Sequence, residues 1–494
     1  MNFKGLLLFF ALVPLLSFGQ FSEKKVYHIE KVQNAPKIDG DLSDRVWTNL
    51  NIANNFSQIQ PNNGTPERNH QRTEVKICYD SKNIYFGVMM YDNAPDSILT
   101  ELGIRDKKDV NSDLFGIFID PFNDGQIEYE LAISAAGVQT DAKITTSYDN
   151  SWDAVWKSAI KINNNGWIAE FSIPFSQLRF PDDNKKWSIN MARSIRRSRE
   201  DYSWNPINVE YTNYALQAGL LDGIKDINSP IRLSFMPYAS IYADMYDGET
   251  TFPYNYGIDL KYGINESFTL DMTLIPDFGQ VSADAMVLNL SPFEVKYEEK
   301  RQFFNEGTEL FEKGGDMFYS RRLQDDLLNA SKVTGRTKNG LGVAVLNAVT
   351  NKTNEDPLTN YNVMIFDQAF GNSSSVSLMN THMVQNGQGK DANVTGVFTR
   401  INNKENTRVY VGKLKMSQEF EGSDLTKGFS GLLAVGKVNG NYKFDLYTIF
   451  EDDKYNPNDL GFLYSNNEIT NGFSISYHQF NENKRFVNSD ISTS

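Results

Sequence analysis

Cysteine and positive charge are both scarce in this chain of 494 residues. Cys78 is its single cysteine, so no intramolecular disulfide framework can form, and its strand-like surroundings favour a small buried side chain. The net charge is −14 and no block of basic residues occurs, which argues against nucleic acid as a partner. The four histidines lie far apart in the sequence and form no metal-binding pair.

Long apolar runs are also missing, with one exception at the start of the chain. After Lys4, residues 6–18 form an apolar run that is shorter than the ~20 residues of a membrane-spanning helix. Ser17 and Gly19 are small residues at the −3 and −1 positions of a cleavage site. We therefore expect residues 1–19 to be a signal peptide and the chain to be exported. Any membrane insertion must then use strands.

The tryptophans divide the chain into two halves. All six lie within the first 204 residues: Trp47, Trp152, Trp156, Trp167, Trp187 and Trp204. The same half contains short strand-like runs separated by clusters of Gly, Asn and Asp, the clearest being 75–79, 84–91, 114–120, 128–134 and 166–173. Short strands without long amphipathic helices predict a β-sandwich over residues 20–225.

The pattern changes after a connector near residues 220–230. Segments of roughly ten residues then alternate apolar with polar or small side chains, as in residues 256–264 and 442–448. This alternation predicts an antiparallel transmembrane β-barrel over residues 226–494, although a soluble all-β domain would give a similar pattern. The irregular segment 276–311 predicts either a plug inside the barrel or an extended surface loop. The whole chain is therefore expected to be all-β.

Several motifs of the first half form a recognisable set. They are Ile38-Asp39-Gly40-Asp41-Leu42 followed by Trp47, Ala136-Gly137-Val138-Gln139-Thr140-Asp141, Trp152-Asp153-Ala154-Val155-Trp156, and Ile173-Pro174-Phe175 after Gly166-Trp167-Ile168-Ala169-Glu170. Together they resemble family 9 carbohydrate-binding modules over about residues 30–220. This resemblance implies a β-sandwich that binds a polysaccharide or oligosaccharide. Because such modules are attached to glycoside hydrolases, it also implies a link to carbohydrate catabolism.

The second half has motifs of its own. They are Pro276-Asp277-Phe278-Gly279-Gln280-Val281, Glu299-Lys300-Arg301 with Phe303-Phe304, and Asn456-Pro457-Asn458-Asp459-Leu460-Gly461. Across about residues 230–465 the chain resembles the barrel region of a Bacteroidota family of outer-membrane proteins of the DUF5916 type. The resemblance implies an outer-membrane location in contact with lipid, and little about activity. Proteins of this type run past the length of this chain, so we expect its barrel to lack strands.

Carbohydrate binding requires a flat aromatic face against the sugar ring and polar side chains for its hydroxyls. Trp152 and Trp204 are the candidates because both stand in polar, loop-like surroundings, and Arg196 is a candidate partner for hydroxyls or acidic sugars. Each tryptophan fits equally well a loop side chain folded over the sandwich, and the arginine fits a salt-bridged strand edge. Trp47, Trp156 and Trp167 lie in apolar surroundings and are expected in the core.

The resemblance also implies a structural calcium ion, since family 9 modules often carry one. Acidic residues near the predicted strand ends supply the candidate ligands Asp92, Asp106, Asp109 and Asp113. Calcium takes six to eight oxygen ligands from several loops. The candidates are close in sequence, which does not by itself bring them together in space.

For catalysis the sequence offers little. Glycoside hydrolysis uses two carboxylates facing each other, one with a raised pKa. The first half contains Glu128, Glu130, Asp141 and Glu170, and the first two share a strand face expected to point to solvent. We therefore favour a binding protein of the outer membrane over a hydrolase acting on O-glycosyl bonds. A transport or assembly barrel whose sandwich binds no sugar is the third alternative.

Overall fold

A computed structural model describes residues 23–494 except 108–109, 146–147, 151, 182–185, 228–231, 266, 277–283, 285, 324–326, 353–356, 372, 388–389, 481–484 and 487. The predicted signal peptide lies outside the described residues. The rest is all-β, as the alternation predicts. No helix in the described part of the chain is long and apolar enough to cross a membrane.

Two sheets of the first half pack face to face as a β-sandwich. The larger sheet has the order β1 (Val26–His28), β14 (Gly219–Asp222), β12 (Lys186–Ile195), β6 (Leu114–Asp120), β7 (Glu128–Ser134), β8 (Gln139–Ile144) and β9 (Tyr148–Asp149), and β13 (Glu200–Ser203) links β12 to β3 (Ser57–Gln60). The smaller sheet has the order β10 (Lys157–Asn163), β11 (Gly166–Pro174), β5 (Asn83–Tyr91), β4 (Thr73–Tyr79) and β2 (Glu30–Lys31).

The core of the sandwich lies between these two sheets. Phe115 of the larger sheet and Phe86 of the smaller one are both fully buried, and both rings contact Phe171 of β11. Five tryptophans belong to the same core or to the small cluster beside it, Trp47, Trp156, Trp167, Trp187 and Trp204. Large aromatic rings bury much apolar surface, so this half carries its own hydrophobic core.

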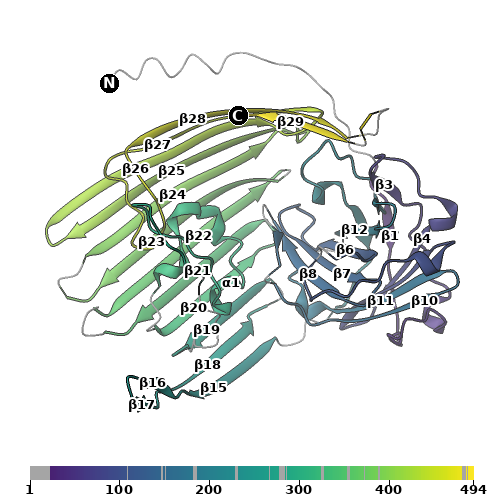
Figure 1. Ribbon diagram of the computed structural model, residues 1–494, viewed down its shortest axis with the longest axis horizontal. Coiled ribbons are helices and arrows are strands. Elements are labelled where there is room, and N and C mark those ends of the chain that lie inside the picture. The colour runs from purple at the N-terminus through teal and green to yellow at the C-terminus, as the bar shows by residue number, and fades with distance from the viewer. Residues whose placement is uncertain are drawn as a thin grey trace.

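The second half forms one large antiparallel sheet (Figure 1). Its strands pair in the order β15 (Leu233–Ile241), β18 (Tyr254–Gly263), β19 (Phe268–Leu274), β20 (Leu327–Arg336), β21 (Leu341–Thr350), β22 (Thr359–Phe370), β23 (Ser374–Gln385), β24 (Asp391–Asn402), β25 (Arg408–Glu421), β26 (Asp424–Lys437), β27 (Tyr442–Glu451), β28 (Glu468–Gln479) and β29 (Ser489–Thr493). A hairpin of β16 (Asp244–Tyr246) and β17 (Glu249–Thr251) joins β15 to β18. Among the described residues β15 and β29 do not pair, so the sheet is open rather than a closed barrel.

The two faces of this sheet differ in burial. Along β24, Val394 and Phe398 are buried on the inner face, whereas Val397 and Ile401 are exposed on the outer face. Exposed apolar side chains also occupy the outer faces of the neighbouring strands, among them Met364, Phe366, Val376, Leu378, Tyr410, Leu414, Phe429 and Leu433. The outer face therefore carries a broad apolar surface, which is unusual for a protein in water.

Short helical segments cover the inner face. They are α1 (Gln302–Asn305), η7 (Phe311–Met317) and η8 (Ser320–Arg322). Phe304, Phe311 and Met317 are buried in one cluster with Val363 and Met379 of the sheet. The remaining 3-10 turns belong to the sandwich: η2 (Arg45–Trp47), η3 (Asn69–Gln71), η4 (Pro95–Ser97), η5 (Phe175–Gln177) and η6 (Ala215–Gln217).

The sandwich lies beside one end of the strands of the large sheet (Figure 1). The connections at this end join β18 to β19, β20 to β21, β22 to β23, β24 to β25, β26 to β27 and β28 to β29. Arg179 donates a hydrogen bond to Thr334 Oγ1 at 3.1 Å and pairs with Glu309 at 3.5 Å, so the two halves contact each other directly. A cavity remains between them.

Candidate functional site

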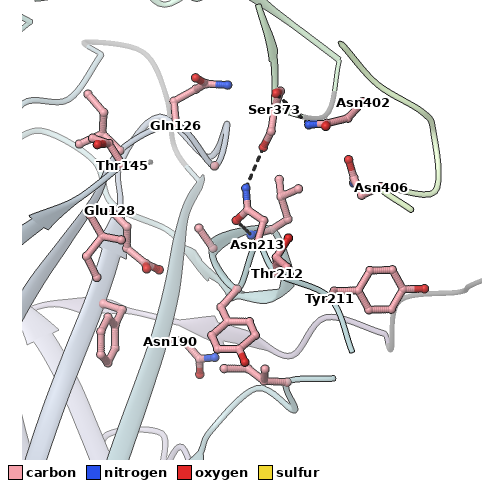
Figure 2. Close-up of a pocket in the computed structure, with 18 of the residues that line it drawn as sticks. Gln126, Glu128, Thr145, Asn190, Tyr211, Thr212, Asn213, Ser373, Asn402 and Asn406 are labelled. Carbon is pink, nitrogen blue, oxygen red and sulfur yellow. Dashed lines mark hydrogen bonds between the residues drawn. The ribbon is translucent and has the colours of Figure 1, made fainter. Parts of the chain in front are cut away.

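The cavity between the sandwich and the large sheet has a volume of about 600 Å³. Its sandwich wall is the outer face of β6, β7 and β12 together with the loop before β14, and the close-up in Figure 2 shows these residues. Its sheet wall comes from Glu309, Leu310, Glu312 and Lys313 and from side chains at the end of the sheet beside the sandwich, Arg336, Ser373, Arg400, Asn402, Asn406 and Val438. Segments far apart in the sequence therefore build one site.

Most polar groups of the cavity are amides and hydroxyls. Those labelled in Figure 2 are Gln126, Thr145, Asn190, Tyr211, Thr212, Asn213, Ser373, Asn402 and Asn406. Asn213 donates from Nδ2 to Ser373 Oγ at 3.0 Å, and Asn402 donates to the Ser373 carbonyl at 2.9 Å. Because Asn213 belongs to the sandwich and Ser373 to the sheet, this hydrogen bond joins the two walls.

Aromatic rings lie beside these polar groups. Phe118, Tyr211 and Tyr214 all line the cavity. Tyr211 is only 5% exposed, whereas Tyr214 is 43% exposed. Tyr214 precedes η6, which fixes the loop through Gln217: the Gln217 side chain bonds the backbone of Asn208 in both directions, at 2.8 and 3.1 Å. Tyr214 therefore presents an accessible aromatic surface on a well-anchored loop.

Glu128 on β7 is the acidic group of the sandwich wall. Glu128 and Glu130 are 7% and 3% exposed, so the prediction that this strand face points to solvent is wrong. The physical reason is that the large sheet covers the face. Burial, with the carboxyls of Asp120 and Glu130 nearby, raises the pKa of Glu128 to about 8. At neutral pH Glu128 is therefore protonated and can donate a hydrogen bond into the cavity.

The predicted binding residues do not form one site. Trp204 is 4% exposed and belongs to the sandwich core, so it offers no open ring face, although its edge lines a separate depression with Lys25. Trp152 is half-buried, and its ring is tilted against that of Tyr129, with the two ring centroids 4.9 Å apart. Arg196 is exposed in the turn after β12 and donates its backbone N–H to Asp113. Trp152 packs on Tyr129 at one end of the larger sheet, whereas Arg196 follows Ile195 at the other end of β12.

The calcium candidates are engaged in other contacts. Asp92 accepts two hydrogen bonds from Arg197, at 2.7 and 2.8 Å. Asp106 accepts the Asp141 N–H at 2.9 Å. Asp109 lies outside the described residues, and within the described part of the chain no three His, Cys, Asp or Glu side chains are grouped to hold a metal ion. The negative charge of Asp92 in particular is neutralised by Arg197 and not by a metal ion.

Two other carboxylates explain the motifs of the first half. Glu170 accepts hydrogen bonds from the backbone N–H groups of Asp39 and Gly40 at 2.9 and 2.7 Å, and from Trp47 Nε1 at 3.1 Å. Asp141 likewise accepts from the Ala154 N–H at 2.6 Å and from Trp156 Nε1 at 3.3 Å. Both carboxylates are fully buried and hydrogen-bonded, so these motifs hold the sandwich together and do not face the cavity.

The sequence reasoning missed the loop that matters most at the cavity. Tyr211-Thr212-Asn213-Tyr214 places two aromatic rings and an amide in four residues, within a loop, and that was the available signal. The residues of the sheet wall gave no signal, because only the packing of the sandwich against the turns brings them to the same place.

Comparisons with known proteins agree with the division into two halves. The model of the family described as domain of unknown function (DUF5916) matches residues 229–325 and 323–494. The model described as carbohydrate family 9 binding domain-like matches residues 38–201. No curated protein matches the chain.

Three solved structures are similar at low levels. A protein of Bacteroides uniformis described as carbohydrate-binding shares 12% identity over 40% of this chain and 99% of its own, with a TM-score of 0.31. Pseudomonas aeruginosa OpdK, solved with vanillate, shares 8% identity over 74% and 75%, with a TM-score of 0.24. The Vibrio cholerae outer membrane protein OmpT shares 11% over 50% and 98%, with a TM-score of 0.18. Likenesses this low establish nothing about what this chain binds.

Proposed function

The chain belongs to the DUF5916 family, and from this membership and the cavity we propose that it is an outer-membrane protein that binds carbohydrate between its sandwich and its large sheet. The observation that carries the proposal is the lining of the cavity: amides, hydroxyls and an accessible tyrosine ring converge on about 600 Å³. The family 9 match over the sandwich supports the same ligand class.

The chemistry of the lining fits sugar hydroxyls. An amide side chain donates through its NH₂ group and accepts through its oxygen, so it can bond two neighbouring hydroxyls at once. Tyr214 supplies the flat apolar surface that stacks against a sugar ring. Pockets for small molecules are on the order of 300–1,000 Å³, and a short oligosaccharide of two or three units falls in that range.

The outer face of the large sheet supports membrane insertion. Its exposed side chains are apolar over many neighbouring strands, for example Leu378, Val397, Leu414 and Leu433. Lipid covers such a surface without the cost that water imposes on it. The predicted signal peptide at residues 1–19 is consistent with export to that membrane.

The lengths of the turns suggest an orientation in the membrane. Bacterial barrels have short periplasmic turns and longer extracellular loops. The longest connections between consecutive strands, from β19 to β20, β27 to β28 and β15 to β18, lie at the other end, whereas most connections at the sandwich end are short, such as 337–340 and 438–441. The tight turn 422–423 at the other end is an exception. We therefore assign the sandwich and its cavity to the periplasmic side.

Binding by the full-length chain in detergent micelles tests the carbohydrate assignment. We expect saturable binding to at least one class of oligosaccharide on a glycan array. Because Tyr214 provides the accessible ring, Tyr214→Ala should weaken binding about tenfold. Trp152→Ala is the matched control, since that ring packs on Tyr129 away from the cavity lining, and it should change affinity by less than about twofold. A folded protein without any hit on the array would contradict the proposal.

Site-directed labelling tests the orientation. Cys78 is the single cysteine, so Cys78→Ser gives a cysteine-free background in which Ser423→Cys and Asn339→Cys report on opposite ends of the sheet. Both positions are exposed turn residues. A membrane-impermeant maleimide should label Ser423→Cys in intact cells and Asn339→Cys only after the outer membrane is opened. The reverse pattern would place the sandwich outside, and labelling of both in intact cells would argue against insertion.

A further inference from the structure

The cations on the sheet wall of the cavity differ in whether a carboxylate faces them. Lys313 and Arg336 both pair with the buried Asp367, at 2.7 and 2.8 Å. Arg400 also lines the cavity, two residues before the end of β24 and on the strand face of the buried Phe398. No hydrogen bond, ion pair or ring contact joins its side chain to any described residue. Its charge therefore has no counter-ion in the described part of the protein.

A second polar side chain of the same wall is also unsatisfied. Asn406 lies in the turn between β24 and β25 and lines the cavity. It is 9% exposed, and neither its Nδ2 nor its Oδ1 has a hydrogen-bond partner within the described residues. A buried amide without partners is costly and rare in native proteins. The neighbouring amide of Asn402, in contrast, bonds to Ser373. Asn406 is thus placed to receive a partner from the cavity.

The acidic side chains around the cavity leave room for a negative ligand. Glu309 faces two cations, Lys143 at 3.9 Å and Arg179 at 3.5 Å. Burial raises the pKa of Glu128 to about 8, so this group is neutral at physiological pH. Glu312, beside Lys313 in the chain, accepts a hydrogen bond from Thr308 at 3.4 Å. Among the described cations of this wall, Lys313 and Arg336 pair with Asp367, whereas Arg400 has no carboxylate partner.

We propose that the sheet wall is a subsite for the acidic unit of a glycan, which binds its carboxylate to Arg400 and a neighbouring hydroxyl to Asn406. This inference rests on the proposed carbohydrate-binding function. The planar guanidinium donates two parallel hydrogen bonds to a carboxylate, a strong and geometrically specific contact. The amide of Asn406 can donate to one sugar oxygen and accept from the next. The ring of the adjoining unit would lie toward Tyr214 on the sandwich wall.

The test compares acidic and neutral forms of one glycan on the full-length chain in detergent micelles. The probes are galacturonate oligomers, their methyl esters, galactose oligomers and 6-sulfated galactose oligomers, on an array that also carries other uronate-containing and neutral glycans. We expect the array hits to be carboxylated glycans, with esterification weakening binding by about 10- to 100-fold. Arg400→Gln should cause the same loss for the acid and no change for the ester. Arg400→Lys should retain part of the affinity because it keeps the charge.

Two further variants sharpen the test. Arg196→Gln removes an exposed arginine that does not line the cavity, so it should leave affinity unchanged. Asn406→Ala should weaken the acid and the ester alike, by about 3- to 10-fold, since it contacts a hydroxyl. Raising the salt concentration should weaken binding of the acid to the wild-type chain and have a smaller effect on Arg400→Gln. Tryptophan fluorescence of each variant verifies that the sandwich is folded.

The outcomes separate this inference from the proposed function. If neutral glycans bind as well as acidic ones, Tyr214→Ala abolishes binding and Arg400→Gln does not, the function stands and the acidic subsite is wrong. Preference for the sulfated over the carboxylated oligomers would likewise overturn the carboxylate assignment. If no glycan binds at all, both the function and the subsite fail.

Discussion

Two regions of the sandwich each bury a carboxyl group, but only one of them supplies it with hydrogen-bond partners from the described residues. In the interior, Glu170 is fully buried and accepts three hydrogen bonds, two from the Asp39–Gly40 backbone and one from Trp47. At the cavity, Glu128 is almost as deeply buried, and no hydrogen bond joins its carboxyl to a described residue. Burial raises the pKa of both groups, but only Glu170 has N–H donors that oppose the shift.

The presence or absence of hydrogen-bond partners distinguishes buried residues that maintain the fold from buried residues that are available to a ligand. A buried polar group whose partners come from the protein stabilises one conformation. A buried polar group without partners lowers stability, and a ligand that supplies the missing partner recovers that loss. Glu128 and Asn406 share this second condition, and both line the cavity together with Arg400, whose exposed side chain has no carboxylate partner among the described residues.

The largest expected effect on stability lies in the sandwich interior, where the buried Glu170 carboxylate has its hydrogen-bond donors. Glu170→Ala leaves the Asp39 and Gly40 N–H groups and Trp47 Nε1 buried without an acceptor, so it should lower the free energy of unfolding of the sandwich by about 4 kcal/mol or more. Because all six tryptophans lie in the first 204 residues, their fluorescence during denaturant unfolding reports on this half of the full-length chain. Asp41→Asn, at a more exposed position of the same loop, is the control and should change stability by less than about 1 kcal/mol. An equal loss of stability in Glu170→Ala and Asp41→Asn would contradict the stabilising role of the buried Glu170 carboxylate.

At the cavity, replacing Glu128 is expected to raise the free energy of unfolding, and the size of this gain depends on pH. Between about pH 4.5, the ordinary pKa of glutamate, and pH 8, folded Glu128 keeps a proton that the unfolded chain releases. The folded state then binds more protons, so the free energy of unfolding falls as pH rises through this window. Glu128→Gln removes this dependence and should be more stable than the wild type by about 3 kcal/mol at pH 7, with the difference disappearing near pH 4. Parallel pH profiles for the two proteins would show that Glu128 is not buried as a neutral acid.

The two regions also differ in what the sequence could reveal. A recurring motif connects the loop at Asp39 and Gly40 with Trp47 and Glu170, because each of these residues has a fixed hydrogen-bond partner in the sandwich. The sandwich could be predicted from such motifs. Strand alternation likewise predicted the antiparallel order of the large sheet, since a lipid-facing or core-facing side chain must occur at every second residue.

The cavity could not be predicted in this way. Tyr214 and Asn406 are separated in the chain by the strands from β15 to β24, and no periodicity relates them. Trp204, which looked accessible from its polar sequence neighbours, is buried because the chain beyond it returns as β14 and packs against it. Accessibility at a junction depends on how two folded halves meet, and local composition carries no information on that.

The smallest expected effect is at the hydrogen bond that joins the two walls. Asn213 Nδ2 donates to Ser373 Oγ at 3.0 Å, and both residues line the cavity. Either Asn213→Ala or Ser373→Ala removes this bond between uncharged groups, so each should weaken glycan binding by about two- to fivefold, through a looser junction. In a double-mutant cycle the two changes should couple by about 1 kcal/mol, because the second substitution has no bond left to break. Strictly additive losses would mean that the two walls hold the ligand independently, and the cavity would then be two half-sites instead of one.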